Sequence, residues 1–135
     1  MARILVDTSA VFALLDRSDR HHPAARQILL KLKKEQHEVF LTNFLVAECY
    51  SLLLVKLGRA LAREWLAGLR WPIERVSESD ESRAREIVLT YQDKDFSYTD
   101  ATSFAIMERL GISTVFAFDR HFEQYGFPPI RVDGT

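Results

Sequence analysis

Four acidic residues stand where a parallel β-sheet would bring them to one edge. Asp7 and Asp119 each follow a short apolar run that is typical of a buried strand. Glu48 lies in a helix that follows a third such run, and Asp100 lies in the first turn of another helix. Since ligands of open parallel sheets bind beyond the carboxyl ends of the strands, this spacing predicts one site that contains all four acids.

Four clustered carboxylates predict a particular chemistry. Like charges at close range raise one another's pKa values, and a bound divalent cation relieves that repulsion. Oxygen ligands suit Mg²⁺ or Mn²⁺, whereas a set without histidine or cysteine argues against zinc. A cation held in this way can bind a phosphodiester and activate a water, and a pair of cations can stabilise both the attacking and the leaving oxygen. The prediction is metal-assisted phosphodiester hydrolysis.

Each acid also has a purely structural interpretation. Asp7 could cap the helix that follows it, and the helix dipole alone favours Asp100 in a first turn. Asp119 could be a turn residue or part of a surface ion pair. Glu48 is the hardest to explain structurally, because an unpaired charge is costly to bury in an almost wholly apolar helix. The four positions together are therefore more informative than any one of them.

The surrounding pattern alternates strands with helices, which is typical of an α/β fold. We expect a three-layer α/β/α sandwich with a mainly parallel central sheet, formed by a single domain over residues 1–135. Residues 120–125 are expected to form a short turn. Apolar and β-branched runs predict the strands, with one at an edge (73–76) and the others at 4–6, 39–41, 114–118 and 130–132.

Helix boundaries and burial can also be predicted. Thr8 or Ser9 is expected to cap the helix after Asp7, and Thr99 the helix that contains Asp100. The helix over residues 44–57 is expected to be buried on nearly every side, because it is apolar on nearly every side. With the next helix it forms a pair whose apolar surface could extend to a second subunit.

Composition excludes some classes of protein. Hydrophobic residues make up 47% and charged residues 27% of the chain, as in a soluble globular protein. No apolar stretch reaches about 18 residues, which argues against a membrane span, and we expect no secretory leader. Cys49 is the only cysteine, which fits a reducing cytoplasm and a small core residue. With a net charge of −1, local charge or a bound metal must attract any nucleic acid.

The four acidic blocks resemble those of the PIN-domain ribonucleases. Within that family the chain is most similar to the VapC-type toxins of type II toxin–antitoxin modules. The resemblance covers nearly the whole chain, the order and spacing of the blocks match, and the first and last blocks are the most specific. The matching segments are residues 4–10 (ILVDTSA), 43–48 (NFLVAE), 97–101 (SYTDA) and 116–122 (FAFDRHF).

The resemblance implies a Mg²⁺- or Mn²⁺-dependent endoribonuclease with a PIN-like fold. It implies direct metal ligands at Asp7 and Asp100, with Glu48 and Asp119 completing or tuning the site. Our hypothesis is that Glu48 orients or deprotonates the attacking water, while Asp119 completes the charge or serves a second metal. Similar toxins are homodimers, and each is held in check by a small antitoxin that binds the toxin and the operator DNA of its own gene pair.

Other residues that could contribute to the site are hydroxyl residues, a histidine and a tryptophan. A hydroxyl residue near the site is common in the family, and the sequence does not rank Thr8, Ser9 and Thr99 as candidates. His121 is interpreted as a surface-turn residue, because this hydrolysis needs no histidine. Trp65 fits an apolar helix face and is interpreted as part of the core or of a dimer interface.

Other functions remain open at this point. A haloacid-dehalogenase-like phosphatase would carry a second Asp two residues after Asp7, where this chain has Ser9. A response-regulator receiver would need an acid pair and a late lysine that the sequence lacks. A PIN-like module could bind RNA or protein without catalysis, although the intact set of acids argues against this. A PIN nuclease could also act in RNA processing or on DNA.

Overall fold

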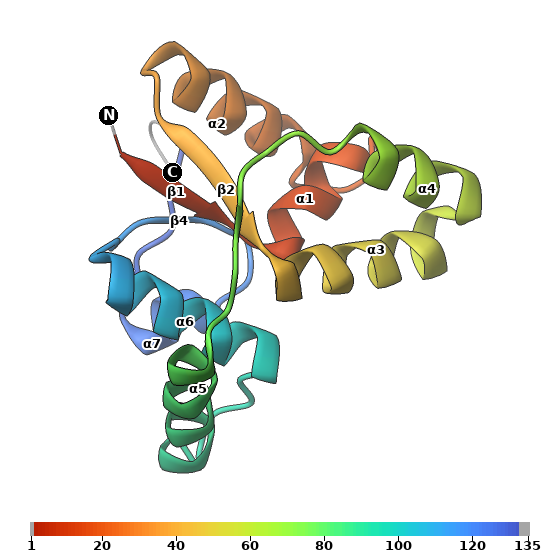
Figure 1. The fold of residues 1–135 in the computed structure, drawn as a ribbon. Coiled ribbons are helices and arrows are strands. Elements are labelled where there is room, and N and C mark those ends of the chain that lie inside the picture. The colour runs from red at the N-terminus through yellow and green to blue at the C-terminus, as the bar shows by residue number, and fades with distance from the viewer. Residues whose placement is uncertain (1, 133–135) are drawn as a thin grey trace.

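A parallel sheet with the strand order β3-β2-β1-β4 forms the centre of the fold (Figure 1). The structure is a computed structural model and describes residues 2–132. Because these strands all run in one direction, their carboxyl ends lie at the same edge of the sheet. The predicted parallel sheet is confirmed, although its outer strands are shorter than predicted. The strands are β1 (Arg3–Val6), β2 (Glu38–Thr42), β3 (Ile73–Glu74) and β4 (Val115–Phe116).

Helices cover both faces of this sheet, so the predicted three-layer architecture is confirmed. In Figure 1, α1 and α2 lie on one side and α5, α6 and α7 on the other, while α3 and α4 form a hairpin that projects beyond the end of β2. No helix within residues 2–132 has the length and apolar character that crossing a bilayer requires. The helices are α1 (Thr8–Leu15), α2 (His22–Lys34), α3 (Asn43–Leu57), α4 (Arg59–Gly68), α5 (Glu78–Thr90), α6 (Tyr98–Leu110) and α7 (His121–Tyr125).

Two predictions for the C-terminal part are wrong. Residues 130–132 do not form a strand, and only an isolated bridge joins Pro129 to Val115. Beside this bridge the Ile130 N–H donates to the Val115 carbonyl at 2.9 Å. Pro128 and Pro129 have no N–H to donate, so a regular ladder cannot begin at this point. The predicted turn before them is instead the short helix α7.

Two predicted helix caps are also wrong. Asp7 itself caps α1, since its carboxylate accepts a hydrogen bond from the Ser9 N–H. Ser97 caps α6 in place of Thr99, because the spacing Ser97-x-x-Asp100 closes a reciprocal capping box. In both cases a residue one or two positions before the predicted cap has a side chain that reaches the free N–H groups. Both caps therefore place an acid at the carboxyl edge of the sheet.

Helix α3 is less buried than its composition predicts. Only Leu45, Cys49 and Leu53 are buried, so one face of the helix packs on the core. Leu54 is 41% exposed and Val55 is 79% exposed. The prediction of burial on nearly every side is wrong for the single chain, because α3 leaves the sheet and runs out along α4 (Figure 1).

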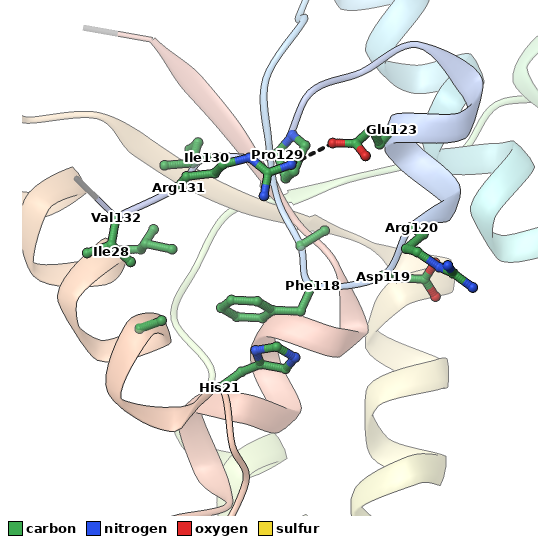
Figure 2. Close-up of a pocket in the computed structure, with 12 residues that line it drawn as sticks. His21, Ile28, Phe118, Asp119, Arg120, Glu123, Pro129, Ile130, Arg131 and Val132 are labelled. Atoms are coloured by element: carbon green, nitrogen blue, oxygen red, sulfur yellow. Dashed lines mark hydrogen bonds and ion pairs between the residues drawn. The ribbon is translucent and has the colours of Figure 1, made fainter. Parts of the chain in front are cut away.

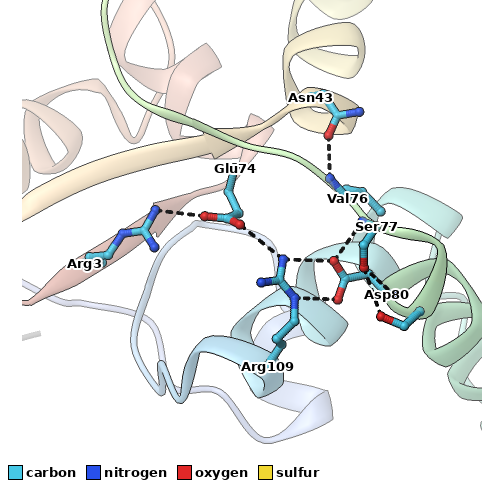
Figure 3. A network of polar contacts seen from close by, with 8 residues as sticks. Arg3, Asn43, Glu74, Val76, Ser77, Asp80 and Arg109 are labelled. Atoms are coloured by element: carbon cyan, nitrogen blue, oxygen red, sulfur yellow. Dashed lines mark hydrogen bonds and ion pairs between the residues drawn. The ribbon is translucent and has the colours of Figure 1, made fainter.

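An ion pair between buried Asp80 and exposed Arg109 joins α5 to α6 (Figure 3). The Arg109 guanidinium donates from Nε and Nη2 to the two oxygens of Asp80, at 2.9 and 3.0 Å. It also reaches Glu74 on β3, which in turn accepts a hydrogen bond from Arg3 on β1. Two-point contacts between a guanidinium and a carboxylate are strong and directional. This network therefore fixes the α5–α6 pair against the sheet.

Candidate active site

The four predicted acids line a single cavity of about 350 Å³ at the carboxyl edge of the sheet. Asp7 comes from the end of β1, Glu48 from α3, Asp100 from the first turn of α6 and Asp119 from the segment after β4. The structure thus brings together every acid that the sequence predicted for the site. The other residues that line the cavity are Thr8, Ser9, Leu52, Ser97 and His121.

Asp7 is held by Ser9, which also bonds the segment that follows β4. Its Oδ2 accepts hydrogen bonds from the Ser9 N–H at 3.1 Å and from the Ser9 hydroxyl at 2.7 Å. The same Ser9 hydroxyl accepts a bond from the Phe118 N–H at 2.9 Å, just beyond β4. Burial raises the pKa of Asp7 to about 7, since the bonds from Ser9 offset only part of the loss of hydration and the charges of Asp100 and Glu48 add to the rise.

Glu48 is held across the helix interface by a hydroxyl. The Thr8 hydroxyl on α1 donates to Glu48 Oε1 at 2.6 Å. Cys49, the next residue on α3, is buried, and its thiol lies 3.6 Å from the same hydroxyl oxygen. Burial raises the pKa of Cys49 to about 12, so the thiol is an inert core group, as predicted. Thr8 therefore positions Glu48, while Ser9 positions Asp7.

Asp100 combines a helix cap with a place in the cavity. Its Oδ2 accepts the Ser97 N–H at 3.1 Å and contacts His121 Nδ1 at 2.7 Å. Burial raises the pKa of Asp100 even though Ser97 and His121 lower it, and the charge of Asp119 adds to the rise. Asp100 is thus a buried acid with no lysine or arginine contact among residues 2–132.

His121 lies in the site, so its interpretation as a surface-turn residue is wrong. Its backbone N–H donates to Asp119 Oδ1 at 2.7 Å, and its ring Nδ1 lies 3.2 Å from that oxygen and 2.7 Å from Asp100. The ring packs edge-on against Phe96, with centroids 5.7 Å apart. The spacing Asp-x-His could have indicated this position. An aspartate that accepts a hydrogen bond from the N–H two residues later fixes the backbone there, and with it the direction of the histidine side chain.

Within residues 2–132 the Thr99 side chain forms no hydrogen bond with any of the four acids. It lines a separate, open hollow with Glu48, Phe44 and Asn43, and its carbonyl accepts a bond from the Thr102 hydroxyl. The structure therefore separates the three hydroxyl candidates. Thr8 and Ser9 each bond one acid, whereas Thr99 does not line the cavity of the four acids.

The donor set fits a hard divalent cation. In residues 2–132, each of the four carboxylates has one oxygen bonded to a neighbouring serine, threonine or histidine, and its other oxygen has no hydrogen bond. Within that range Ser103 Oγ is the only fully buried side-chain oxygen or nitrogen without a hydrogen-bond partner. The carboxylate oxygens without a hydrogen bond are therefore not fully buried. Within the same range no three histidine, cysteine or acidic side chains lie in an arrangement that could hold a metal ion without some movement. The oxygens that remain free are of the type that Mg²⁺ and Mn²⁺ bind.

A family model for the PIN domain matches residues 4–128 of the chain. The chain is also 31% identical over 132 residues to a 23S rRNA-specific endonuclease, VapC20, of Mycobacterium tuberculosis, which covers 95% of this chain and 98% of that protein. The match spans all four acids and both hydroxyl residues that hold them.

Solved structures give the same picture. The crystal structure of M. tuberculosis VapC20, described as a sarcin–ricin loop cleaving toxin, superposes with a TM-score of 0.85 at 30% identity and covers 96% of this chain and 99% of that one. VapBC2 of Rickettsia felis bound to a promoter DNA fragment has a TM-score of 0.72 at 12% identity, with 98% of this chain and 100% of that one covered. FitAcB of Neisseria gonorrhoeae has a TM-score of 0.68 at 19% identity, with coverage of 98% and 97%. The last two share the fold.

Proposed function

The chain belongs to the PIN-domain family, and from that premise we propose that it is a metal-dependent endoribonuclease and the toxin of a VapBC-type toxin–antitoxin pair. Its relative VapC20 is named for cleavage of 23S rRNA at the sarcin–ricin loop. We propose the same loop as the substrate of this protein. Mg²⁺ or Mn²⁺ is the proposed cofactor, and the cytoplasm is the proposed place of action.

One observation carries the proposal. Four acids from four separate elements line one cavity, and no lysine or arginine among residues 2–132 pairs with any of them. Burial and the charges of neighbouring acids disfavour the charged forms of Asp7 and Asp100, so the stability of the fold does not explain why these acids lie together. A bound cation compensates for both effects, and it supplies a Lewis acid for phosphodiester hydrolysis.

The residues have separate roles in this proposal. Asp7 and Asp100 hold the metal through the oxygens that have no hydrogen bond. Glu48, fixed by Thr8, orients or deprotonates the water that attacks the phosphorus. Asp119 completes the negative charge of the site. His121 holds the Asp100 carboxylate in place, since an ionised carboxylate requires a proton on Nδ1.

We also propose a homodimer and an antitoxin as partners. The relevant observation is the exposed apolar surface on the α3–α4 hairpin, where Leu54, Val55 and Leu66 are 41%, 79% and 45% exposed. Large apolar side chains that gather on an exposed surface are typical of interaction sites. The solved relatives VapBC2 and FitAcB have the same fold.

A cleavage assay with a matched pair of variants tests the function. The purified protein, free of antitoxin, is incubated with a synthetic sarcin–ricin hairpin and with total RNA, in Mn²⁺, in Mg²⁺ or in chelator. Asp7→Asn should lower cleavage more than about 100-fold, since even indirect metal contacts contribute 10- to 100-fold. Asp16→Asn is the matched control, because Asp16 accepts the same two bonds from Ser18 that Asp7 accepts from Ser9, but away from the site.

The possible outcomes separate the alternatives. Metal-dependent cuts that disappear only in Asp7→Asn support the nuclease, and their positions identify the substrate. Cleavage of total RNA outside the hairpin would reject the sarcin–ricin loop and keep the nuclease. RNA binding without any cleavage, by protein that binds Mn²⁺, would favour a binding module instead.

A further inference from the structure

We propose that a second cavity, adjacent to the four carboxylates, binds one nucleobase of the RNA substrate next to the phosphate that is cleaved. This inference rests on the proposed endoribonuclease function. The cavity has a volume of about 440 Å³ and lies between the start of α2, the segment from β4 to α7 and the chain after Pro129 (Figure 2). Asp119 lines both cavities, so the two cavities adjoin there and an RNA strand bound at the carboxylates lies beside this one.

Two aromatic rings form one wall of the cavity. His21 and Phe118 stack with their centroids 4.5 Å apart and their planes 11° from parallel. Both residues are half-buried and line the cavity, and Figure 2 shows one ring lying over the other. Proteins that read unpaired RNA stack its bases on faces of this type.

The aromatic wall is fixed relative to the acids. The Phe118 N–H donates to the Ser9 hydroxyl, and that hydroxyl donates to Asp7. A base stacked at this wall would therefore lie in a defined place relative to Asp7. Such pre-organisation lets base binding help to position the reacting phosphate.

Charge at the rim favours RNA over an apolar peptide. Arg120 follows Asp119 and is exposed, and its guanidinium has no hydrogen bond or ion pair within residues 2–132. It provides a cation for a phosphate beside carboxylates that would otherwise repel the RNA. Across the cavity Arg131 pairs with Glu123 at 2.6 Å, which presents donors and acceptors to the edge of a base (Figure 2).

The first test is direct binding of nucleoside monophosphates, followed by NMR, with inorganic phosphate as a second probe. The four nucleotides should shift the ring resonances of His21 and Phe118, and His21→Ala should weaken their binding about tenfold, the range found for loss of one stacking partner. His37→Ala, a histidine before β2 at the other end of the sheet, is the matched control. Equal binding of phosphate and nucleotides, or no binding at millimolar concentration, would overturn the proposal.

The second test uses the cleavage assay. A series of hairpins is prepared, each with one abasic nucleotide at a different position around the cut. One of them should be cleaved about tenfold more slowly than the intact hairpin, and His21→Ala should remove this difference in rate. If His21→Ala cleaves RNA and the abasic nucleotide slows it as much as it slows the wild type, the base site is overturned and the proposed nuclease function is retained. Nucleotide binding that depends on His21, without cleavage of any RNA, would support the base site and reject the proposed function.

Discussion

Asp80 and Asp100 occupy the same position in the same local motif, yet they have opposite properties. Each lies at the third position of its helix and completes a capping box, with Ser77 for Asp80 and Ser97 for Asp100. Both are buried, with exposed fractions of 3% and 6%. The local sequence and the burial are alike, so the difference must come from other parts of the chain.

The difference is a cation. Burial raises the pKa of Asp80, but bonds from Arg109 and Ser77 outweigh it, so the pKa is lowered overall. Asp100 has no such partner, and burial keeps its pKa above the ordinary value. Asp80 therefore stabilises the fold (Figure 3), whereas Asp100 is left in need of a positive charge. An acid that is buried without a cation is the more informative sign of function.

Asp7 and Asp16 form a second pair of this kind and give the largest expected effect on stability. In the folded protein the pKa of Asp7 is about 7, above the ordinary value of 3.8, so the folded state loses stability as the pH rises from 3.8 to 7. At about 1.4 kcal/mol per pKa unit, Asp7→Asn should stabilise the metal-free protein by roughly 4–5 kcal/mol above pH 7. Asparagine caps helices as well as aspartate does. The gain should disappear below about pH 4.

Urea unfolding in chelator over this pH range measures the effect. Asp16→Asn should show no such gain, because bonds from Ser18 lower the pKa of Asp16. Mn²⁺ should reverse the order, since a ligand that binds only the folded state stabilises the wild type and not Asp7→Asn. A pH-independent difference between Asp7→Asn and the wild type would show that desolvation is not its origin.

The Asp80 and Asp100 pair gives the next largest effect. Asp80→Asn removes a charged hydrogen-bond partner from Arg109 and should destabilise the protein by about 2 kcal/mol. Asp100→Asn should leave stability unchanged or raise it, while abolishing metal-dependent cleavage. Unfolding of the two variants in chelator at one pH compares them directly. If both lose the same stability, the contrast drawn from Arg109 is wrong.

The sequence predicts the scaffold of the site better than its finer contacts. Apolar runs that end in an acid identify the strands and their shared edge, because strand burial is a local pattern. Asp80 and Asp100 cannot be told apart in this way, since Arg109 lies one helix away from Asp80. The apolar composition of α3 indicates burial. It does not say whether the same chain or a partner covers the helix, and in the single chain Val55 is exposed.

His121 illustrates the same limit. Its sequence neighbours suggest a surface turn. The Asp-x-His spacing indicates its backbone bond to Asp119, whereas the packing of α7 on α6 brings its ring to Asp100. The ring lies against Phe96, and Tyr125 of the same short helix stacks on Phe104 of α6 with centroids 4.3 Å apart. Side chains positioned by contacts across the fold leave no periodic signal in the sequence.

The smallest predicted effect concerns this histidine. His121→Ala removes the hydrogen bond to Asp100 Oδ2 and should weaken Mn²⁺ binding about tenfold, the lower end of the range for residues that orient metal ligands. His121→Asn keeps a donor near the position of Nδ1 and should retain most of the affinity. Calorimetric titration of Mn²⁺ measures both variants, with His37→Ala as the control. If asparagine binds Mn²⁺ no better than alanine, the role of His121 lies in packing against Phe96, and Asp100 is oriented by Ser97 alone.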